Sequence, residues 1–343
     1  MFSISPKESE RGGSCAGRSS STTRSKSCPS TKKEGWNETW TRGGGARRLP
    51  GSRRARGLGR RGALRPGNQL DAGRRAAKLP ALPAEVKNRK RWVIGVKCDV
   101  PSFGYIDVRG NHAGYDVEIA RRFAELAFGK KNRVTLVCVT TPSRIPALTS
   151  KRVDIIISTV TFTFARAQEI DFSTPYYGAT GRLLVPKDSA INSLADIKGK
   201  TVVTTRGALY ADWLKKCFKD TNLLELDTTT TAFLAIKDRR ADAFMWDDAL
   251  LLSLSTQDKD TRMTKDKFLA VPWGIGIRKG DSATKQWVDA VLARMQAKDE
   301  FVKILESNVP KSLFDDFKGN VPRPGASLKF PATPETHPVN ICP

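Results

Sequence analysis

The chain has few histidines and no long apolar runs. His112 and His337 are the only histidines in 343 residues, and the six cysteines include no C-x-x-C pair. A zinc site is therefore improbable, because zinc sites are built mainly from clustered Cys and His. No apolar run is long enough to span a membrane, and none resembles the core of about 7–15 residues that a secretory leader needs.

Acidic residues are scarce in the first quarter. Residues 1–90 contain 22 Lys and Arg against 6 Asp and Glu, a net of +16 out of +24 for the whole chain. They are rich in Gly, Ser, Arg and Pro and show almost no apolar periodicity, so we expect a disordered basic tail. Such an arm could bind nucleic acid or an anionic membrane. The alternative is that it has no function, and this is favoured because neither a pattern of alternating aromatic and basic residues nor a known motif accompanies the charge.

The remaining chain alternates strand-like and helix-like segments, and its length suggests about two domains. Strands are predicted at WVIGV, VTLVCV and VDIIIS, which begin at residues 92, 134 and 153. Between the first two lies a helical pattern with apolar residues at 117, 120, 123, 124 and 127 and Gly129 at its end. This alternation predicts an α/β fold with parallel sheets.

A second α/β unit follows. Strands are predicted at TVVTT, LLELD and ADAFMW, with helices between them, and FLAVPWGIGIRK reads as a strand that leads back. A long amphipathic helix over 283–305 should place Trp287, Val291, Met295 and Phe301 inward.

The stretch 154–177 carries the clearest functional pattern. A short isoleucine-rich strand is followed by the hydroxyls of Ser158, Thr159 and Thr161 and then by Arg166. Ligands of open α/β sheets bind beyond the carboxyl ends of strands. Arg166 could hold a carboxylate with both arms of its guanidinium; the alternative is a solvated surface arginine.

This stretch, DIIISTVTFTFARAQEIDFSTPYY, resembles the signature of the polar amino-acid solute-binding proteins of ABC uptake systems, and the likeness runs from about 91 to about 309. The resemblance implies a two-lobed type II periplasmic binding fold, each lobe a mainly parallel sheet flanked by helices, with a ligand cleft between them. Lobe one would comprise 91–182 plus 273–309, lobe two 183–272, and 310–343 would be a Pro-rich C-terminal extension.

The same resemblance implies a monomer that needs no cofactor, closes on an amino acid and presents it to the membrane subunits of an ABC permease. Nucleic acid is not an expected partner. The location would be the periplasm or cell envelope, and this rests on the resemblance alone because no leader is visible.

Charges at the strand ends suggest the ligand class. The α-carboxylate of an amino acid would meet Arg166 and its ammonium Asp247, which leaves the cations Lys97 and Arg144. Burying these without an anionic partner would be costly, so the ligand should bring a second negative charge. In the family, Lys97 stands where binders of cationic amino acids have an acid. Arg144 in S-R-I-P resembles the arginine of glutamate- and aspartate-binding members.

Each residue also has a plainer interpretation. Lys97 could be an exposed strand-end lysine, Arg144 could pair with Asp154, and Asp247 could cap the following helix. Thr159 and Thr161 could be ordinary strand threonines.

Other points are left open by the sequence. Thr229 is a weaker candidate for the distal group of the ligand. Many relatives have threonines where this chain has Ala208-Leu209-Tyr210, so a hydroxyl is lost there. Glutamate and aspartate are not distinguished.

Two further alternatives concern chemistry. The fold also carries enzymes such as cyclohexadienyl or arogenate dehydratase, which need a general acid. Asp99 and Asp107 are candidates, but a binding protein without catalytic residues is favoured. Cys98 and Cys138 could form a disulfide, although ordinary buried thiols are favoured.

Overall fold

The computed structural model describes residues 78–343, which lie within one compact unit, Leu70–Pro343. Among these residues, no helix is both long and apolar enough to cross a membrane. The expectation of a disordered tail over 1–77 concerns residues outside this part. Over 78–90 that expectation is wrong, because helix α1 (Ala84–Arg89) forms there. Its Val86 is buried, and Arg89 pairs with Asp154.

One sheet has five strands in the order β5-β1-β6-β14-β7. Strands β5, β1 and β6 pair in parallel, and β14 pairs antiparallel with both β6 and β7, so β14 is the strand that runs in the opposite direction. The strands are β1 (Trp92–Val96), β5 (Val134–Cys138), β6 (Ile155–Ile157), β7 (Ile170–Phe172) and β14 (Gly276–Arg278). Helix α2 (Tyr115–Phe128) packs on β1, β5 and β6 through the predicted apolar stripe, and Gly129 ends it in a left-handed conformation.

A second, six-stranded sheet has the order β10-β9-β11-β8-β12, with β13 also paired to β8. Here β10, β9 and β11 pair in parallel, β8 pairs antiparallel with β11, and β12 and β13 both pair antiparallel with β8. The strands are β8 (Tyr177–Pro186), β9 (Thr201–Thr205), β10 (Asn222–Leu226), β11 (Ala243–Asp247), β12 (Thr261–Met263) and β13 (Phe268–Trp273). Both sheets are thus mixed, and each has a parallel half.

The chain passes between the two sheets where β7 leads to β8 and again where β13 leads to β14. We call the five-stranded sheet with its helices lobe one and the six-stranded sheet with its helices lobe two. The boundary expected between 182 and 183 falls inside β8, whose full length pairs within lobe two. The helices of lobe one are α1, α2, α3 (Arg144–Thr149), α4 (Phe164–Glu169), α8 (Ser282–Ala297) and α9 (Glu300–Asn308); those of lobe two are α5 (Leu209–Cys217), α6 (Thr229–Lys237) and α7 (Asp248–Gln257). A further helix, α10 (Lys311–Phe317), contacts both α9 and α7.

The predicted long helix over 283–305 is two helices, α8 and α9. Asp299, between them, has a φ of 55°, which a continuous helix does not allow. The four residues expected to face inward, Trp287, Val291, Met295 and Phe301, are buried. Trp287 packs on Trp92 of β1 with ring centroids 5.1 Å apart.

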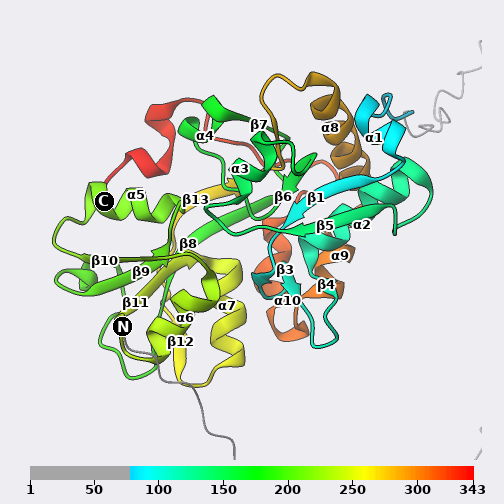
Figure 1. The fold of residues 1–343 in the computed structure, drawn as a ribbon. Coiled ribbons are helices and arrows are strands. Elements are labelled where there is room, and N and C mark those ends of the chain that lie inside the picture. Colours follow the sequence, from blue (N-terminus) through cyan, green and yellow to red (C-terminus); the bar gives the residue numbers. More distant parts are fainter. Residues whose placement is uncertain (1–77) are drawn as a thin grey trace, which may run out of the picture. The chain divides into compact units, whose positions relative to one another are not determined.

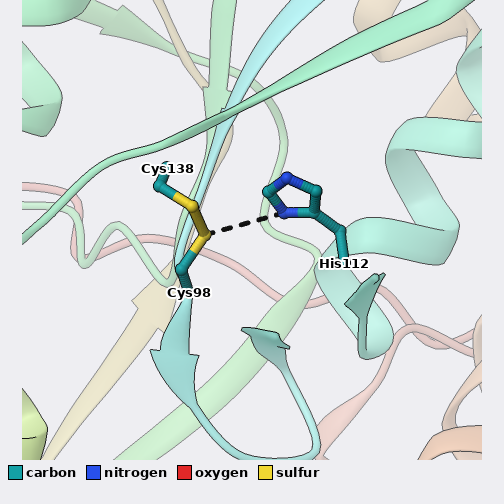
Figure 2. Close-up of side chains that lie close together, drawn as sticks. All are labelled: Cys98, His112 and Cys138. Carbon is teal, nitrogen blue, oxygen red and sulfur yellow. Dashed lines mark hydrogen bonds between the residues drawn. A yellow bond between two sulfur atoms is a disulfide. The ribbon is translucent and has the colours of Figure 1, made fainter. Parts of the chain in front are cut away.

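Two disulfides, Cys98–Cys138 and Cys217–Cys342, join the cysteines of the described chain. The expectation of free buried thiols at 98 and 138 is wrong, because β1 and β5 are neighbours in register and Cys98 leaves β1 beside Cys138. Figure 2 shows His112 Nδ1, which lies 3.6 Å from Cys98 Sγ. Since both sulfurs are bonded to each other, this group lacks the thiolates that a zinc ion would need.

Beyond β1, a three-stranded sheet of β2 (Asp99–Val100), β3 (Gly104–Ile106) and β4 (His112–Ala113) leads into α2. Gly110 and Gly114 flank β4, and both have positive φ, 81° and 118°. A Cβ at Gly114 would overlap the backbone of Phe103, whereas a Cβ at Gly110 would meet nothing within 4 Å.

These two glycines give a matched stability test. Gly110→Ala should lower the free energy of unfolding by about 1 kcal/mol, the cost of a positive φ for alanine. Gly114→Ala should lose a further ~1–3 kcal/mol, because the backbone must also shift to make room. Urea unfolding of both variants measures this difference, and equal losses would contradict the tight contact with Phe103.

Candidate functional site

Arg166 lies between the two lobes. It belongs to the short helix α4, which begins after β6, and the Thr163 side chain caps that helix by accepting from Arg166 N at 3.1 Å. The guanidinium donates to Thr161 O of lobe one at 2.6 Å and to Gly207 O of lobe two at 2.8 Å. Burial lowers its pKa, while Asp212 and Asp247 act in the opposite direction. Arg166 is therefore a cation held by both lobes and is not a solvated surface arginine.

Arg144, the first residue of α3, is 2% exposed. Its Nη1 donates to Ser158 O at 2.8 Å and to Thr159 O at 3.0 Å, and its buried Nε has no partner among the described residues. Burial, and next the nearby Arg166, lower the pKa of Arg144 to about 9. It does not pair with Asp154, which instead accepts from Arg89 and from Val93 N.

Asp247 ends β11 and is 3% exposed. Tyr210 Oη donates to one carboxylate oxygen at 2.5 Å, and Trp273 Nε1 donates to the other at 3.0 Å. Burial raises its pKa to about 7. Asp247 occupies the N-cap position of α7, but its side chain makes no capping hydrogen bond. Asp248, rather than Asp247, binds backbone near the start of α7: its carboxylate accepts from Ala249 N, and it also accepts from Thr180.

The segment after β6 is shaped by a left-handed residue. The strand ends at Ile157, and Thr159 has a φ of 46°, so Thr159 is not an ordinary strand threonine. Asp116 of α2 accepts from Thr159 N at 3.0 Å, which holds this turn, and burial raises the pKa of Asp116 to about 7. The buried hydroxyls of Ser158 and Thr159 have no partner among the described residues.

Lys97 and Thr229 form a neighbouring group around Asp99. Lys97 is fully buried, and its Nζ lies 3.0 Å from Asp99 Oδ1 and 3.2 Å from Thr141 Oγ1. Burial lowers its pKa, while Asp99 opposes this. Thr229 of lobe two donates to Asp99 Oδ2 through its N at 2.9 Å and to Asp99 O through its hydroxyl at 2.5 Å. Lys97 is thus not an exposed lysine, and its charge already has a carboxylate.

Part of the predicted set lines one small enclosed space. The space measures about 10 Å³, which is roughly the room for one water molecule. Its lining combines predicted residues with others from lobe two: Arg144, Thr159, Thr161, Arg166, Ala208, Leu209, Tyr210, Trp246 and Asp247. Lys97, Ser158 and Thr229 are not in that lining.

Tyr210, Trp246 and Trp273 were not predicted as site residues. Tyr210 stands in the stretch where the sequence suggested a lost hydroxyl, yet its own hydroxyl binds Asp247. The tyrosine ring and Trp246 have centroids 6.0 Å apart, and both line the small space between the lobes. The usable signal was Tyr210 itself, a bulky side chain that also carries a hydroxyl.

Larger hollows lie elsewhere on the surface. One of about 510 Å³ is lined by residues including Lys187, Asp188, Lys237 and Arg239. Four of its charged residues already form ion pairs, Arg239 with Asp188 at 2.9 Å and Lys237 with Asp260 at 2.9 Å. The convergent, incompletely partnered charges lie at the strand ends, so we take that location as the site.

The two carboxyls considered as general acids do not suit that role. Asp107 is in an exposed turn and accepts from Arg109 N and Asn111 N, and these hydrogen bonds, chiefly that from Asn111, lower its pKa. Asp99 is bound to Lys97 and Thr229. Both carboxylates are thus already engaged as hydrogen-bond or ion-pair acceptors.

Comparison with known proteins places the chain in a family. The model of the bacterial extracellular solute-binding proteins, family 3, matches residues 92–310. A glutamine-binding protein of Geobacillus stearothermophilus is 39% identical over 57% of this chain and 75% of its own length. An L-glutamate/L-aspartate-binding protein of Pseudomonas aeruginosa is 30% identical over 76% of this chain and 87% of its own.

Solved structures agree with this. A cysteine-binding protein from Campylobacter jejuni has a TM-score of 0.62 and 33% identity, covering 66% of this chain and 92% of its own. The fold is that of the two-lobed type II periplasmic binding proteins. The chain belongs to family 3 of the bacterial extracellular solute-binding proteins.

Proposed function

We propose that the protein is the extracytoplasmic binding component of an ABC amino-acid uptake system and that its ligand is an acidic amino acid, glutamate or aspartate. The observation that carries the acidic ligand is Arg144. It is buried, it donates only to backbone carbonyls among the described residues, and its Nε has no partner there. A buried cation of this kind is stabilised by an anion that the ligand brings.

The other ligand groups would meet charges of opposite sign. Arg166 would take the α-carboxylate, since its planar fork suits bidentate binding. Asp247 would take the α-ammonium, which would replace Tyr210 Oη or add to it. Thr159, Thr161 and Ser158 lie beside these charges and would supply hydroxyls. No bond is broken in this function, and the work is done by closure of lobe two on lobe one.

The structure changes the number of unpaired cations from which the sequence predicted an acidic ligand. Lys97 and Arg144 both counted as surplus cations from the sequence, but Asp99 neutralises Lys97 at 3.0 Å. One surplus cation, Arg144, remains in this group, and one second carboxylate on the ligand would match it. Lys97 stays a predicted contact, now as half of an ion pair that could donate a hydrogen bond without attracting a further charge.

The relatives support the binding of an amino acid more strongly than they support an acidic amino acid as the ligand. Their names include a glutamine binder at 39% identity and a glutamate/aspartate binder at 30%. Glutamine and glutamate have the same length and differ in the charge of the distal group. A comparison of these two ligands therefore tests the role of Arg144 directly.

Arg144→Met removes the charge and keeps much of the side-chain volume. We expect wild type to bind L-glutamate more tightly than L-glutamine. In the variant, affinity for glutamate should fall by roughly tenfold or more, as a buried charge contact is lost, and affinity for glutamine should change less. Isothermal titration calorimetry with both ligands measures this. A wild-type preference for glutamine would overturn the acidic ligand and leave amino-acid binding intact.

Arg166→Ala should weaken the binding of every amino acid that the protein takes. Loss of a desolvated carboxylate contact costs about 2 kcal/mol or more, which is roughly 30-fold in affinity or greater. Arg240→Ala, at an exposed arginine of lobe two, is the control and should bind as wild type does. Calorimetry gives the affinities, and circular dichroism confirms folding. Normal binding by a folded Arg166→Ala protein would remove Arg166 from the site.

Binding should depend on pH through Asp247. Burial raises its pKa to about 7, and an ammonium group favours its ionised form. Affinity should therefore rise as the pH increases from 5 to 7, by up to about tenfold per unit, and level off above. Dissociation constants at pH 5, 6, 7 and 8 measure this slope.

The control for this slope is Asp116→Asn, because the pKa of Asp116 is also raised to about 7. If Asp247 is the titrating group, this variant keeps the slope. A flat profile in wild type, or a slope that disappears in Asp116→Asn, would exclude Asp247 as the titrating partner.

A further inference from the structure

From Arg323 onward, the C-terminal extension packs on lobe one. Arg323 binds the carboxylate of Asp299 at 2.8 and 3.0 Å, and Gln296 of α8 donates to Arg323 O at 2.9 Å. Further along, Phe330 stacks on Phe162 with ring centroids 4.5 Å apart. The segment therefore follows lobe one from the end of α8 to the residue after Thr161.

His337 is the last anchor on lobe one. It is 1% exposed, and its Nε2 lies 2.9 Å from Phe162 O. A carbonyl only accepts, so Nε2 carries the proton, and Nδ1 then accepts from Val339 N at 3.2 Å. The His337 ring also lies near Phe164, the first residue of α4, with centroids 6.0 Å apart. This anchor therefore touches the segment that carries Thr161 and Arg166.

The chain then reaches lobe two within a few residues. Lys216 Nζ donates to Asn340 O at 3.0 Å, and Trp213 Nε1 donates to Ile341 O at 3.1 Å. Cys342 forms a disulfide with Cys217 at the end of α5. In Figure 1 the red C-terminal segment accordingly passes α4 and ends beside α5.

We propose that residues 323–342 form an interlobe strap, fixed covalently to α5 and packed on lobe one, which restricts opening of the cleft. Five residue steps separate His337 from Cys342, so these anchors can lie at most roughly 18 Å apart while His337 stays bound. The turn Pro338–Asn340 takes up part of that length. Wider opening must first extend this turn and then release His337 and Phe330 from Phe162.

The effect of the strap is independent of amino-acid binding, because the strap restricts movement of the lobes whether or not a ligand is present. The closed form should gain population, and both entry and release of a ligand should slow. The two disulfides differ in this respect. Cys217–Cys342 fixes the strap to lobe two, whereas Cys98–Cys138 lies within lobe one and joins neighbouring strands.

The test compares the double variants C217S/C342S and C98S/C138S as full chains without ligand. Amide hydrogen exchange of Gly207–Tyr210 and Thr159–Thr161, which face each other between the lobes, reports opening. We expect at least fivefold faster exchange in C217S/C342S than in wild type, with a larger radius of gyration by X-ray scattering. In C98S/C138S both should stay close to wild type.

A strap variant that exchanges like wild type overturns the proposal, and so do equal increases in the two double variants, which would indicate general loosening. His337→Ala keeps the disulfide and should give a smaller increase, with the exposed Glu335→Ala unchanged. Once an amino acid is found to bind, its dissociation should also be at least fivefold faster in C217S/C342S. Because the exchange readout needs no ligand, failure of the acidic-ligand proposal leaves this test intact.

Discussion

Charges that lie between the lobes without direct ion pairing dominate this structure; Arg144 and Asp247 are buried, and Arg166 is half-buried. Arg144 and Arg166 are held by backbone carbonyls, and Asp247 is held by the neutral donors of Tyr210 and Trp273. Such partners stabilise a buried charge less than an opposite charge does, and the lowered pKa of Arg144 and the raised pKa of Asp247 both express that cost. A zwitterion with a second carboxylate offers each of them an opposite charge, which is why the proposed function follows from these groups.

Lys97 differs from Arg144 and Arg166 because it is paired with a carboxylate, that of Asp99. The sequence shows Lys97 and Asp99 two positions apart at the end of a strand, where alternate side chains share a face. Their proximity was therefore predictable, but not the burial of Lys97 or the hydrogen bonds from Thr229 to Asp99 across the lobes. Periodicity describes one segment at a time, whereas this group draws on β1, β2 and α6.

Other differences between prediction and structure have the same cause. The strands β1, β5, β6, β9 and β11 were predictable from short β-branched runs. The position of Asp247 at the end of β11 and that of Arg166 beyond the end of β6 followed from them. The disulfide Cys98–Cys138 could not be predicted without knowing that β1 pairs with β5. Helix α1 could not be predicted without knowing that Arg89 contacts Asp154. Average composition over 1–90 concealed α1, since one short helix changes that average little.

Helix α5 connects the proposed site to the proposed strap. Its first turn places Tyr210 Oη 2.5 Å from Asp247, and Gly207, two residues before the helix begins, accepts from Arg166 of lobe one. Its last residue, Cys217, is bonded to the C-terminal segment that packs on Phe162. A movement of lobe two that separates Gly207 from Arg166 also moves Cys217 relative to Phe162, because one helix carries both ends. The charges in the cleft and the strap outside it therefore oppose the same movement. For this reason, the bulky Tyr210 and the C-terminal disulfide are best understood together, as two supports for the closed arrangement of α5.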